Sequence, residues 1–180
     1  DMGALYAASR TISASLERDE ILQRLAQSMA WAVECSSAVI FEHRREMDDL
    51  RVLAVYSPGE AGQGGEALPA LWEPFPLADS PAFRTVVEQR HPLALRATDA
   101  AVAGPDQARL ARNGICAELL VPLVVQDDLI GVAALIEGRG DRIFSPGEVY
   151  KAEALASQAA VTLRQSVLFD EVRELEKLKR

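Results

Sequence analysis

The chain is poor in the residues on which most catalytic and metal sites depend. Its 180 residues include two cysteines, Cys35 and Cys116, and two histidines, His43 and His91. Two cysteines do not form a disulfide framework, and reduced thiols are typical of the cytoplasm, where we expect this protein to be. Neither histidine has a second ligand at metal-binding spacing, so we predict no metal site.

Long apolar runs and a surplus of positive charge are also missing. No run approaches the roughly 18 residues that cross a bilayer, and the N-terminus has no signal-peptide pattern. The 19 basic and 27 acidic residues give a formal charge of −8, which disfavours contacts with nucleic acid phosphates. No basic amphipathic helix is present. We therefore expect no nucleic acid partner and no membrane contact by this segment.

Recognisable catalytic motifs are absent as well. There is no legible Ser/His/Asp arrangement. The four glycines between Ser57 and Ala70 lack the lysine and the strand–loop–helix setting of a phosphate-binding loop. They predict a surface loop, and the sequence favours a protein that is not an enzyme.

Two apolar segments between Leu119 and Ile136 give a strong structural signal. The segments LLVPLVV and LIGVAALI are joined by the polar residues QDD, as in the two strands of a β-hairpin. We expect this hairpin at the centre of a buried antiparallel sheet. Hydrophobic residues make up 49% of the chain, which is enough to form a core around it.

Helical patterns occupy both ends of the chain. Apolar residues at helical spacing predict a first helix over Leu5–Leu16, and Asp19 is placed to cap a second helix that ends near Cys35. The last helix begins at a capping box formed by Ser145 and Glu148, and its pattern continues to the end of the chain.

The apolar seam of this last helix is longer than one small domain can cover. We expect the excess to pack against the same helix of a second copy, which gives a homodimer. Because the pattern continues to the last residue, we also expect this chain to be a piece of a longer polypeptide. The seam residues are Val161, Leu168, Val172 and Leu175.

Shorter elements fill the middle of the chain. Ser80-Pro81 starts one short helix, and Asn113-Gly114 ends another. The order of elements predicts an α+β domain with an antiparallel sheet and helices grouped at both ends of the chain. The middle elements are predicted at Ala38–Glu42, Leu50–Tyr56, Trp72–Leu77, Pro81–Gln89, His91–Leu95 and Asp106–Arg112.

Four stretches taken together resemble the GAF domain, a small-molecule-sensing relative of the PAS domain. No single stretch is as strict as a catalytic signature, but the four in this order cover most of the chain. They are ASRTISASLERDEILQRLAQSMAWAVECSSAVIF (8–41), FPLADSPAFRTVVEQRHPLAL (75–95), RNGICAELLVPLVVQDDLIGVAALIE (112–137) and IFSPGEVYKAEALASQAAVTLRQS (143–166).

The resemblance implies a GAF-like, profilin-like fold with a six-stranded antiparallel sheet. A bundle of the first, second and last helices would cover one face, and short helices and loops would enclose a ligand pocket on the other. The implied sensor domain spans 1–166, with N-terminal helices at 4–34, sheet and pocket at 36–137 and the C-terminal helix from 146. Residues 167–180 would continue that helix toward an output domain in the same parent chain, as the terminal helix of such proteins commonly does.

The resemblance also allows cofactors to be weighed. Relatives that attach a bilin use a cysteine, usually followed by a histidine, at a position that reads GPDQ here (Gly104–Gln107), which argues against a bilin. Haem-binding relatives use one pocket histidine. His91 is the residue to test, although its place before Pro92 favours a surface role. The Asn-Lys-Phe-Asp-Glu signature of cyclic-nucleotide-binding relatives is not legible, and the cofactor stays unknown.

Seven residues are candidates for the pocket wall. A carboxylate in an apolar strand is costly to bury unless it is paired, so Glu118 contacts a ligand, an arginine or solvent. Cys116 precedes it by two positions on the same face, as a pocket thiol or as a small apolar filler. Aromatic side chains can line a pocket or fill it. The candidates are Phe41, Trp72, Phe75, Phe83, Cys116, Glu118 and Leu120.

The expected function is that of a non-enzymatic sensory module in a bacterial signalling protein, such as a sensor histidine kinase, cyclase or phosphatase. Such a module binds an unknown small ligand and relays its state through a dimeric helical bundle. One alternative is a structural dimerisation module with a filled pocket. A third alternative is a thiol-dependent methionine sulfoxide reductase. It is weaker because this chemistry needs two thiols in reach of each other, and Cys35 is expected on the opposite face of the sheet from Cys116.

Overall fold

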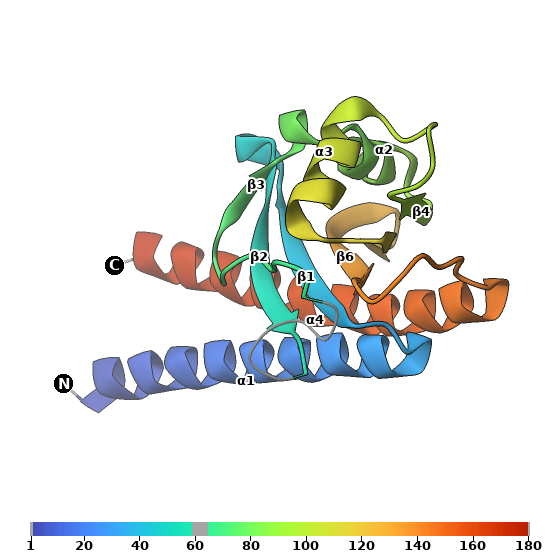
Figure 1. The fold of residues 1–180 in the computed structure, drawn as a ribbon. Helices are drawn as coiled ribbons and strands as arrows, with labels where there is room; N and C mark the ends of the chain where they lie inside the picture. Colours follow the sequence, from blue (N-terminus) through green and yellow to red (C-terminus); the bar gives the residue numbers. More distant parts are fainter. Residues whose placement is uncertain (1, 59–64, 180) are drawn as a thin grey trace.

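The structure, a computed structural model, describes residues 2–58 and 65–179, without the side chains of residues 8, 11 and 166–174. Four α-helices and six strands make up the described part of the chain (Figure 1). The helices are α1 (Met2–Val33), α2 (Pro81–Gln89), α3 (Gly104–Asn113) and α4 (Pro146–Leu178). The strands are β1 (Ser37–Arg44), β2 (Asp49–Tyr56), β3 (Pro74–Pro76), β4 (Leu93–Arg96), β5 (Ala117–Val125) and β6 (Asp128–Glu137), with 3-10 turns η1 (Arg45–Met47) and η2 (Leu77–Asp79).

The strands form one six-stranded sheet in the order β3-β2-β1-β6-β5-β4, and every neighbouring pair is antiparallel. The α+β class and the six-stranded antiparallel sheet are therefore confirmed. The apolar hairpin is β5 and β6, and β6 lies at the centre of the sheet. Its turn is Gln126-Asp127, both with positive φ, as a two-residue hairpin of the usual twist requires.

Two layers cover the two faces of the sheet (Figure 1). The long helices α1 and α4 run side by side on one face, and α2 and α3 lie on the other. Alternate residues of the central strands belong to different apolar clusters: Ala133 and Leu135 pack under α1 and α4, whereas Val132 and Ala134 pack under α2 and α3. Burial on both faces explains why these strands are apolar at consecutive positions.

The two predicted N-terminal helices are one continuous helix, α1, so the predicted break at Asp19 is wrong. No glycine or proline lies between Leu16 and Ile21, and an Asp inside a helix costs less than about 0.7 kcal/mol relative to Ala. Asp19 accepts a hydrogen bond from Arg18 Nε over 3.0 Å and does not cap a helix. The layer of helices therefore consists of two long helices where three were expected.

Local sequence signals place the other helix ends. Ser80 accepts from the Phe83 N–H at the start of α2, and Ser145 and Glu148 form the expected capping box at the start of α4. Gly114, with a φ of 67°, ends α3. Among the described residues, none of the helices combines the length and the apolar character that a bilayer crossing requires.

Candidate functional site

A cavity of about 740 Å³ lies on the face of the sheet that α2 and α3 cover. Its volume is within the range of small-molecule sites, which is roughly 300–1,000 Å³. The floor comes from β1, β2, β5 and β6, and the walls come from the segment 67–79, α2 and α3. The lining residues are Val39, Phe41, Val52, Ala67, Leu68, Pro69, Glu73, Pro74, Phe75, Pro76, Ala78, Asp79, Phe83, Pro105, Ala108, Arg109, Arg112, Asn113, Ile115, Glu118, Ala134 and Ile136.

Three phenylalanines form an aromatic cluster in this lining. The ring centroids of Phe75 and Phe83 are 4.6 Å apart, and Phe41 lies 5.4 Å from Phe83 and 6.0 Å from Phe75. Phe41 and Phe83 are buried, and Phe75 is half-buried. The cluster presents aromatic edges and faces to the cavity, and it also occupies part of the space between the sheet and α2.

A buried ion pair lies beside these rings. Arg109 of α3 donates to the two carboxylate oxygens of Glu118 in β5, from Nη2 over 2.8 Å and from Nη1 over 3.1 Å. Both residues are at least nine-tenths buried. The two-pronged geometry suits a planar guanidinium and a carboxylate, and each group offsets the cost of burying the other.

The ion pair extends to the start of α2 through Asp106. Arg109 Nη2 also lies 3.4 Å from Asp106 Oδ1. Asp106 accepts from the Ser80 hydroxyl over 2.5 Å and from the Ala82 N–H over 2.8 Å. A residue of α3 thus accepts from a first-turn N–H of α2, a group that has no partner within its own helix. One polar network connects β5, α3 and α2 around the cavity.

Arg109 is the cation at the centre of this network. Burial lowers the pKa of Arg109, but the nearby Glu118 and Asp106 carboxylates outweigh burial and hold the pKa above its ordinary value. Its guanidinium carbon lies 5.2 Å from the centroid of the Phe83 ring and 5.9 Å from that of Phe75. The Arg109 Nε–H is buried and has no hydrogen-bond partner among the described residues.

Four of the seven predicted pocket residues line the cavity, and three do not. Phe41, Phe75, Phe83 and Glu118 all line the cavity. Leu120 is fully buried in the apolar cluster on the same face but does not line the cavity.

Two other predicted pocket residues also lie outside the lining. Trp72 is 47% exposed, and its ring lies under the Arg51 guanidinium at 5.2 Å. Cys116 precedes β5, and its Sγ is 3.7 Å from the Gly138 carbonyl oxygen. Alternation predicted Cys116 on the cavity face, but Cys116 lies before the first residue of β5 and does not line the cavity, although Ile115 and Glu118 on either side of it do.

Among the residues that the structure describes, no thiol or histidine lines the cavity. Cys35 belongs to the apolar cluster under α1 and α4, where burial raises its pKa to about 11, so thiolate is scarce near neutral pH. Gly104–Gln107 forms the first turn of α3, so a bilin would find no cysteine for covalent attachment in the lining. His91 and His43 lie elsewhere, and a haem in this cavity would have no histidine ligand. The described residues contain no cluster of metal-binding side chains.

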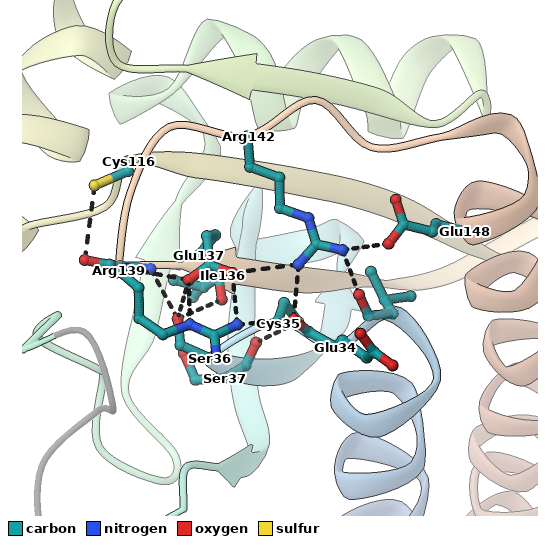
Figure 2. A network of polar contacts seen from close by, with 12 residues as sticks. Glu34, Cys35, Ser36, Ser37, Cys116, Ile136, Glu137, Arg139, Arg142 and Glu148 are labelled. Atoms are coloured by element: carbon teal, nitrogen blue, oxygen red, sulfur yellow. Dashed lines mark hydrogen bonds and ion pairs between the residues drawn. The ribbon is translucent and has the colours of Figure 1, made fainter.

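A second polar cluster, the helix junction, joins the ends of α1, β6 and α4 (Figure 2). Arg142 donates to the carbonyl oxygens of Val33 and Glu34, the latter over 2.8 Å, and Arg139 donates to the Glu34 oxygen over 2.8 Å. The last carbonyls of a helix lack partners and carry partial negative charge, so two guanidinium groups stabilise this end. Arg142 also pairs with Glu148 in the first turn of α4. One side chain thus holds the end of α1 against the start of α4.

Glu137, the last residue of β6, lies at the centre of the helix junction (Figure 2). Its carboxylate accepts from Arg139 over 2.8 and 2.9 Å, from Arg142 over 3.2 Å and from the Ser36 hydroxyl over 3.2 Å. Burial by itself raises the pKa of Glu137. Hydrogen bonds from Arg139 and Arg142 outweigh burial and lower the pKa to about 2.

Glu66 connects the helix junction to the cavity wall. It is buried and accepts from the Ser37 hydroxyl over 3.0 Å. A Cβ placed on Gly138 would lie 2.1 Å from Glu66 Oε2, so the loop after β6 passes directly against this carboxylate. The next residues, Ala67 and Leu68, line the cavity. Glu66 is thus tied to the helix junction by its side chain and to the cavity wall by the backbone that continues into Ala67 and Leu68.

Sequence reasoning did not identify Arg109 or the arginines of the helix junction. Arg109 follows Asp106 by three positions, which places both on one face of α3, and Glu118 was already expected to need a partner. These two observations together were the available signal. Arg139 and Arg142 lie in the irregular segment GRGDR, where no periodicity indicates what they contact.

The predicted seam of α4 is described in part. Val161 is 47% exposed and Leu175 is 59% exposed, so neither is covered within one copy of the chain. The side chains of Leu168 and Val172 lie outside the described residues.

Comparisons with known proteins agree with this architecture. The GAF domain family matches residues 17–163. The blue-light absorbing form of the PixJ GAF domain of Thermosynechococcus elongatus superposes with a TM-score of 0.71 at 19% identity, covering 92% of this chain and 96% of that one. The phycoerythrobilin-bound GAF domain of a cyanobacterial phytochrome gives 0.71 at 19% identity, with 94% and 97% covered.

A third structure comes from a signalling kinase. The GAF domain of a two-component sensor histidine kinase from Bacillus halodurans superposes with a TM-score of 0.68 at 18% identity, covering 84% of this chain and 97% of that one. A comparison with curated proteins found no match. At these identities the structures establish the fold alone. The family match spans most of the chain, which confirms the predicted resemblance: the chain belongs to the GAF domain family.

Proposed function

We propose that this domain is a non-enzymatic sensory module that binds a small molecule in the cavity beside Arg109. The supporting observation is the cavity itself, a site of about 740 Å³ with apolar walls and a few convergent polar groups. This composition is typical of small-molecule sites, in which apolar surface supplies affinity and a few polar groups fix orientation. The sensor unit comprises residues 1–166 of a bacterial signalling protein in the cytoplasm.

The bound state is relayed through α1 and α4. The Glu66 side chain contacts Ser37 and Gly138 beside the helix junction, and the residues that follow it, 67–69, line the cavity. The junction in turn holds the ends of both helices. A ligand that changes the position of the wall segment 67–69 would change the packing at the junction. It shifts the helices only as far as its affinities for the two arrangements differ. Residues 167–180 carry the change toward an output domain.

The aromatic cluster favours a second candidate function. Phe41, Phe75 and Phe83 occupy part of the space under α2, as they would in a domain whose pocket is filled and whose role is dimerisation alone. The two functions make different predictions about binding. A sensor gains stability from a small molecule, and a purely structural domain does not.

The test is a thermal-shift screen of a metabolite panel combined with two matched tryptophan variants of α3. Ala108 is exposed and lines the cavity, so Ala108→Trp blocks the entrance without disturbing the core. Ala111 is exposed on the same helix outside the lining, so Ala111→Trp is the control. A compound at 100 times its Kd adds about 2.7 kcal/mol, which raises Tm by about 5–10 °C in a domain of this size.

We expect this increase in the original domain and in Ala111→Trp, but not in Ala108→Trp. Mass spectrometry of the gently purified domain should also detect a retained small molecule. If no compound raises Tm and no small molecule is retained, the domain is a structural module. Equal increases in both tryptophan variants would place the binding site elsewhere.

A further inference from the structure

We infer that the cavity selects an uncharged, flat aromatic molecule that carries a carbonyl acceptor, such as an aryl amide. This inference rests on the proposed function, because it concerns the chemistry of the same site. Three features of the lining determine it: the charges around Arg109, the unpaired Nε–H of Arg109 and the aromatic cluster.

The charges around the cavity disfavour an anionic ligand. The buried cation Arg109 already contacts two carboxylates, Glu118 and Asp106. An anion at this point would face both carboxylates in a medium that screens charge poorly. The other charged residues of the lining are again two carboxylates and one cation: Glu73, Asp79 and Arg112. Phosphate-bearing or carboxylate-bearing molecules therefore meet a surplus of negative charge beside Arg109 and in the lining as a whole.

The unpaired donor disfavours a cationic ligand. Arg109 is 6% exposed, and its Nε–H has no partner among the described residues. A buried donor without an acceptor is costly, and an acceptor on a bound molecule would remove that cost. An ammonium or amidinium group has no acceptor to offer at this point. It would also compete with the Arg109 guanidinium for the faces of Phe75 and Phe83.

The aromatic cluster supplies the apolar part of the recognition. Phe41, Phe75 and Phe83 lie with centroids 4.6–6.0 Å apart and all line the cavity. Offset or edge-to-face contacts with a further ring are favourable at such spacings. A flat ring placed against this cluster can direct an attached carbonyl oxygen toward Arg109, which lies over two of the same rings.

The test uses three probes of nearly equal shape: 2-naphthamide, 2-naphthoate and 2-naphthamidine, which are neutral, anionic and cationic near pH 7. Their dissociation constants are measured by ligand-observed NMR titration against the original domain, Ala108→Trp and Ala111→Trp. We expect 2-naphthamide to bind at least about tenfold more tightly than either charged probe. We also expect its binding to be lost in Ala108→Trp and kept in Ala111→Trp.

Charge-changing variants test the cause of the selectivity. Glu118→Gln removes one of the two carboxylates from Arg109, so the ratio of the 2-naphthoate to the 2-naphthamide dissociation constant should fall about tenfold. If Glu118→Gln does not fold, the exposed pair Glu73→Gln and Asp79→Asn tests the same point, with a fall of a few-fold because solvent screens the rim. Glu88→Gln, exposed on α2 and outside the lining, should change nothing.

The outcomes separate this inference from the proposed function. If 2-naphthoate or 2-naphthamidine binds more tightly than 2-naphthamide, and Ala108→Trp abolishes the binding, the inference is overturned and the cavity remains a ligand site. The same holds if charged members of the metabolite panel bind in the cavity while 2-naphthamide does not. If neither the probes nor the panel bind, the proposed function fails as well.

Discussion

Glu118 and Glu137 are both buried carboxylates, but they differ in how they are stabilised. Glu118 receives two hydrogen bonds from a single residue, Arg109. Glu137 receives hydrogen bonds from Arg139, Arg142 and Ser36, and its pKa falls to about 2. A carboxylate whose pKa is lower in the folded state than in the unfolded chain stabilises the fold only while it is ionised.

The stability of the domain should therefore decrease in acid, in part through Glu137. The folded-state pKa is about 2 and the ordinary value is 4.5, so the contribution is complete above about pH 4.5 and lost as the pH falls toward 2. The two values convert to about 3 kcal/mol, and we expect on the order of 2 kcal/mol, because the half-exposed Arg139 is partly screened by solvent. Urea unfolding at pH 7, 5, 4 and 3 measures the loss.

The variant Glu137→Gln provides the reference for this measurement. It keeps the size of the side chain but has no carboxylate to titrate, so its stability should change less between pH 5 and pH 3. An equally steep decrease in the variant would show that other carboxyl groups cause the loss.

At single positions, sequence alone identified polar residues in apolar surroundings and missed polar residues in polar surroundings. Glu118 was recognisable because every neighbour in its strand is apolar. Arg109 lies in the helix GPDQARLARN, where a charged residue looks ordinary. Its burial follows from the packing of α3 on the sheet, which involves residues far apart in the sequence.

Helix ends in this domain are held in two different ways. The start of α4 is capped by residues close in sequence: the Ser145 hydroxyl accepts from the Glu148 N–H, and the Glu148 carboxylate accepts from the Ser145 N–H. The end of α1 is capped by residues distant in sequence, because its last carbonyls accept from Arg139 and Arg142, more than a hundred positions later. Local caps are visible in sequence, and distant ones are not.

Removal of the local cap should weaken the domain measurably. Ser145→Ala deletes the hydroxyl that accepts from the first turn of α4, and we expect a loss of about 1 kcal/mol in the free energy of unfolding. Ser157→Ala is the matched control, because Ser157 is exposed within the same helix and donates only to the Glu153 carbonyl. The control should stay within about 0.5 kcal/mol of the original domain by urea unfolding. Equal losses in both variants would mean that the cap contributes nothing specific.

Element prediction was accurate where turn chemistry was explicit. Ser80-Pro81 at the start of α2 and Asn113-Gly114 at the end of α3 are favoured by few other structures. The hairpin turn was indicated by three polar residues between two apolar runs. The missing break at Asp19 shows the reverse case. A possible capping residue does not end a helix when the residues on both sides have good helix propensity and the helix continues to pack on its neighbour.

At the scale of the whole molecule, the long helices leave apolar side chains uncovered. Leu5, Ile12 and Leu16 on α1 and Val161 on α4 are exposed. Exposed apolar groups that recur along adjacent helices are a common sign of an interface, and we propose that these helices join two copies of the domain. Val161→Glu should then shift the dimer toward monomer and leave the circular dichroism spectrum unchanged.

Sedimentation velocity at about 50 μM measures the association, since dimers with micromolar or lower Kd are populated there. Ile143→Glu is the control, because Ile143 is 74% exposed but lies in the loop before α4. It should leave the dimer intact. An original domain that sediments as a monomer would rule out this interface.

The overall class could be predicted because the order of elements and the four resembling stretches constrain it strongly. The location of the cavity could be predicted only as a side of the sheet. Its lining depends on how α3 and the segment 67–79 pack. Alternation and composition predicted Cys116 and Trp72 in the lining, but this packing leaves both outside it.

The N-terminal half of α1 projects past the sheet that supports the rest of the helix (Figure 1). A projecting rigid rod is a lever. With a rise of 1.5 Å per residue, the roughly 16 residues beyond the sheet reach about 24 Å, so a tilt of about 5° at the sheet moves the tip by about 2 Å. A small tilt of α1 where it packs on the sheet therefore becomes a displacement of atomic size at the N-terminal tip of the helix.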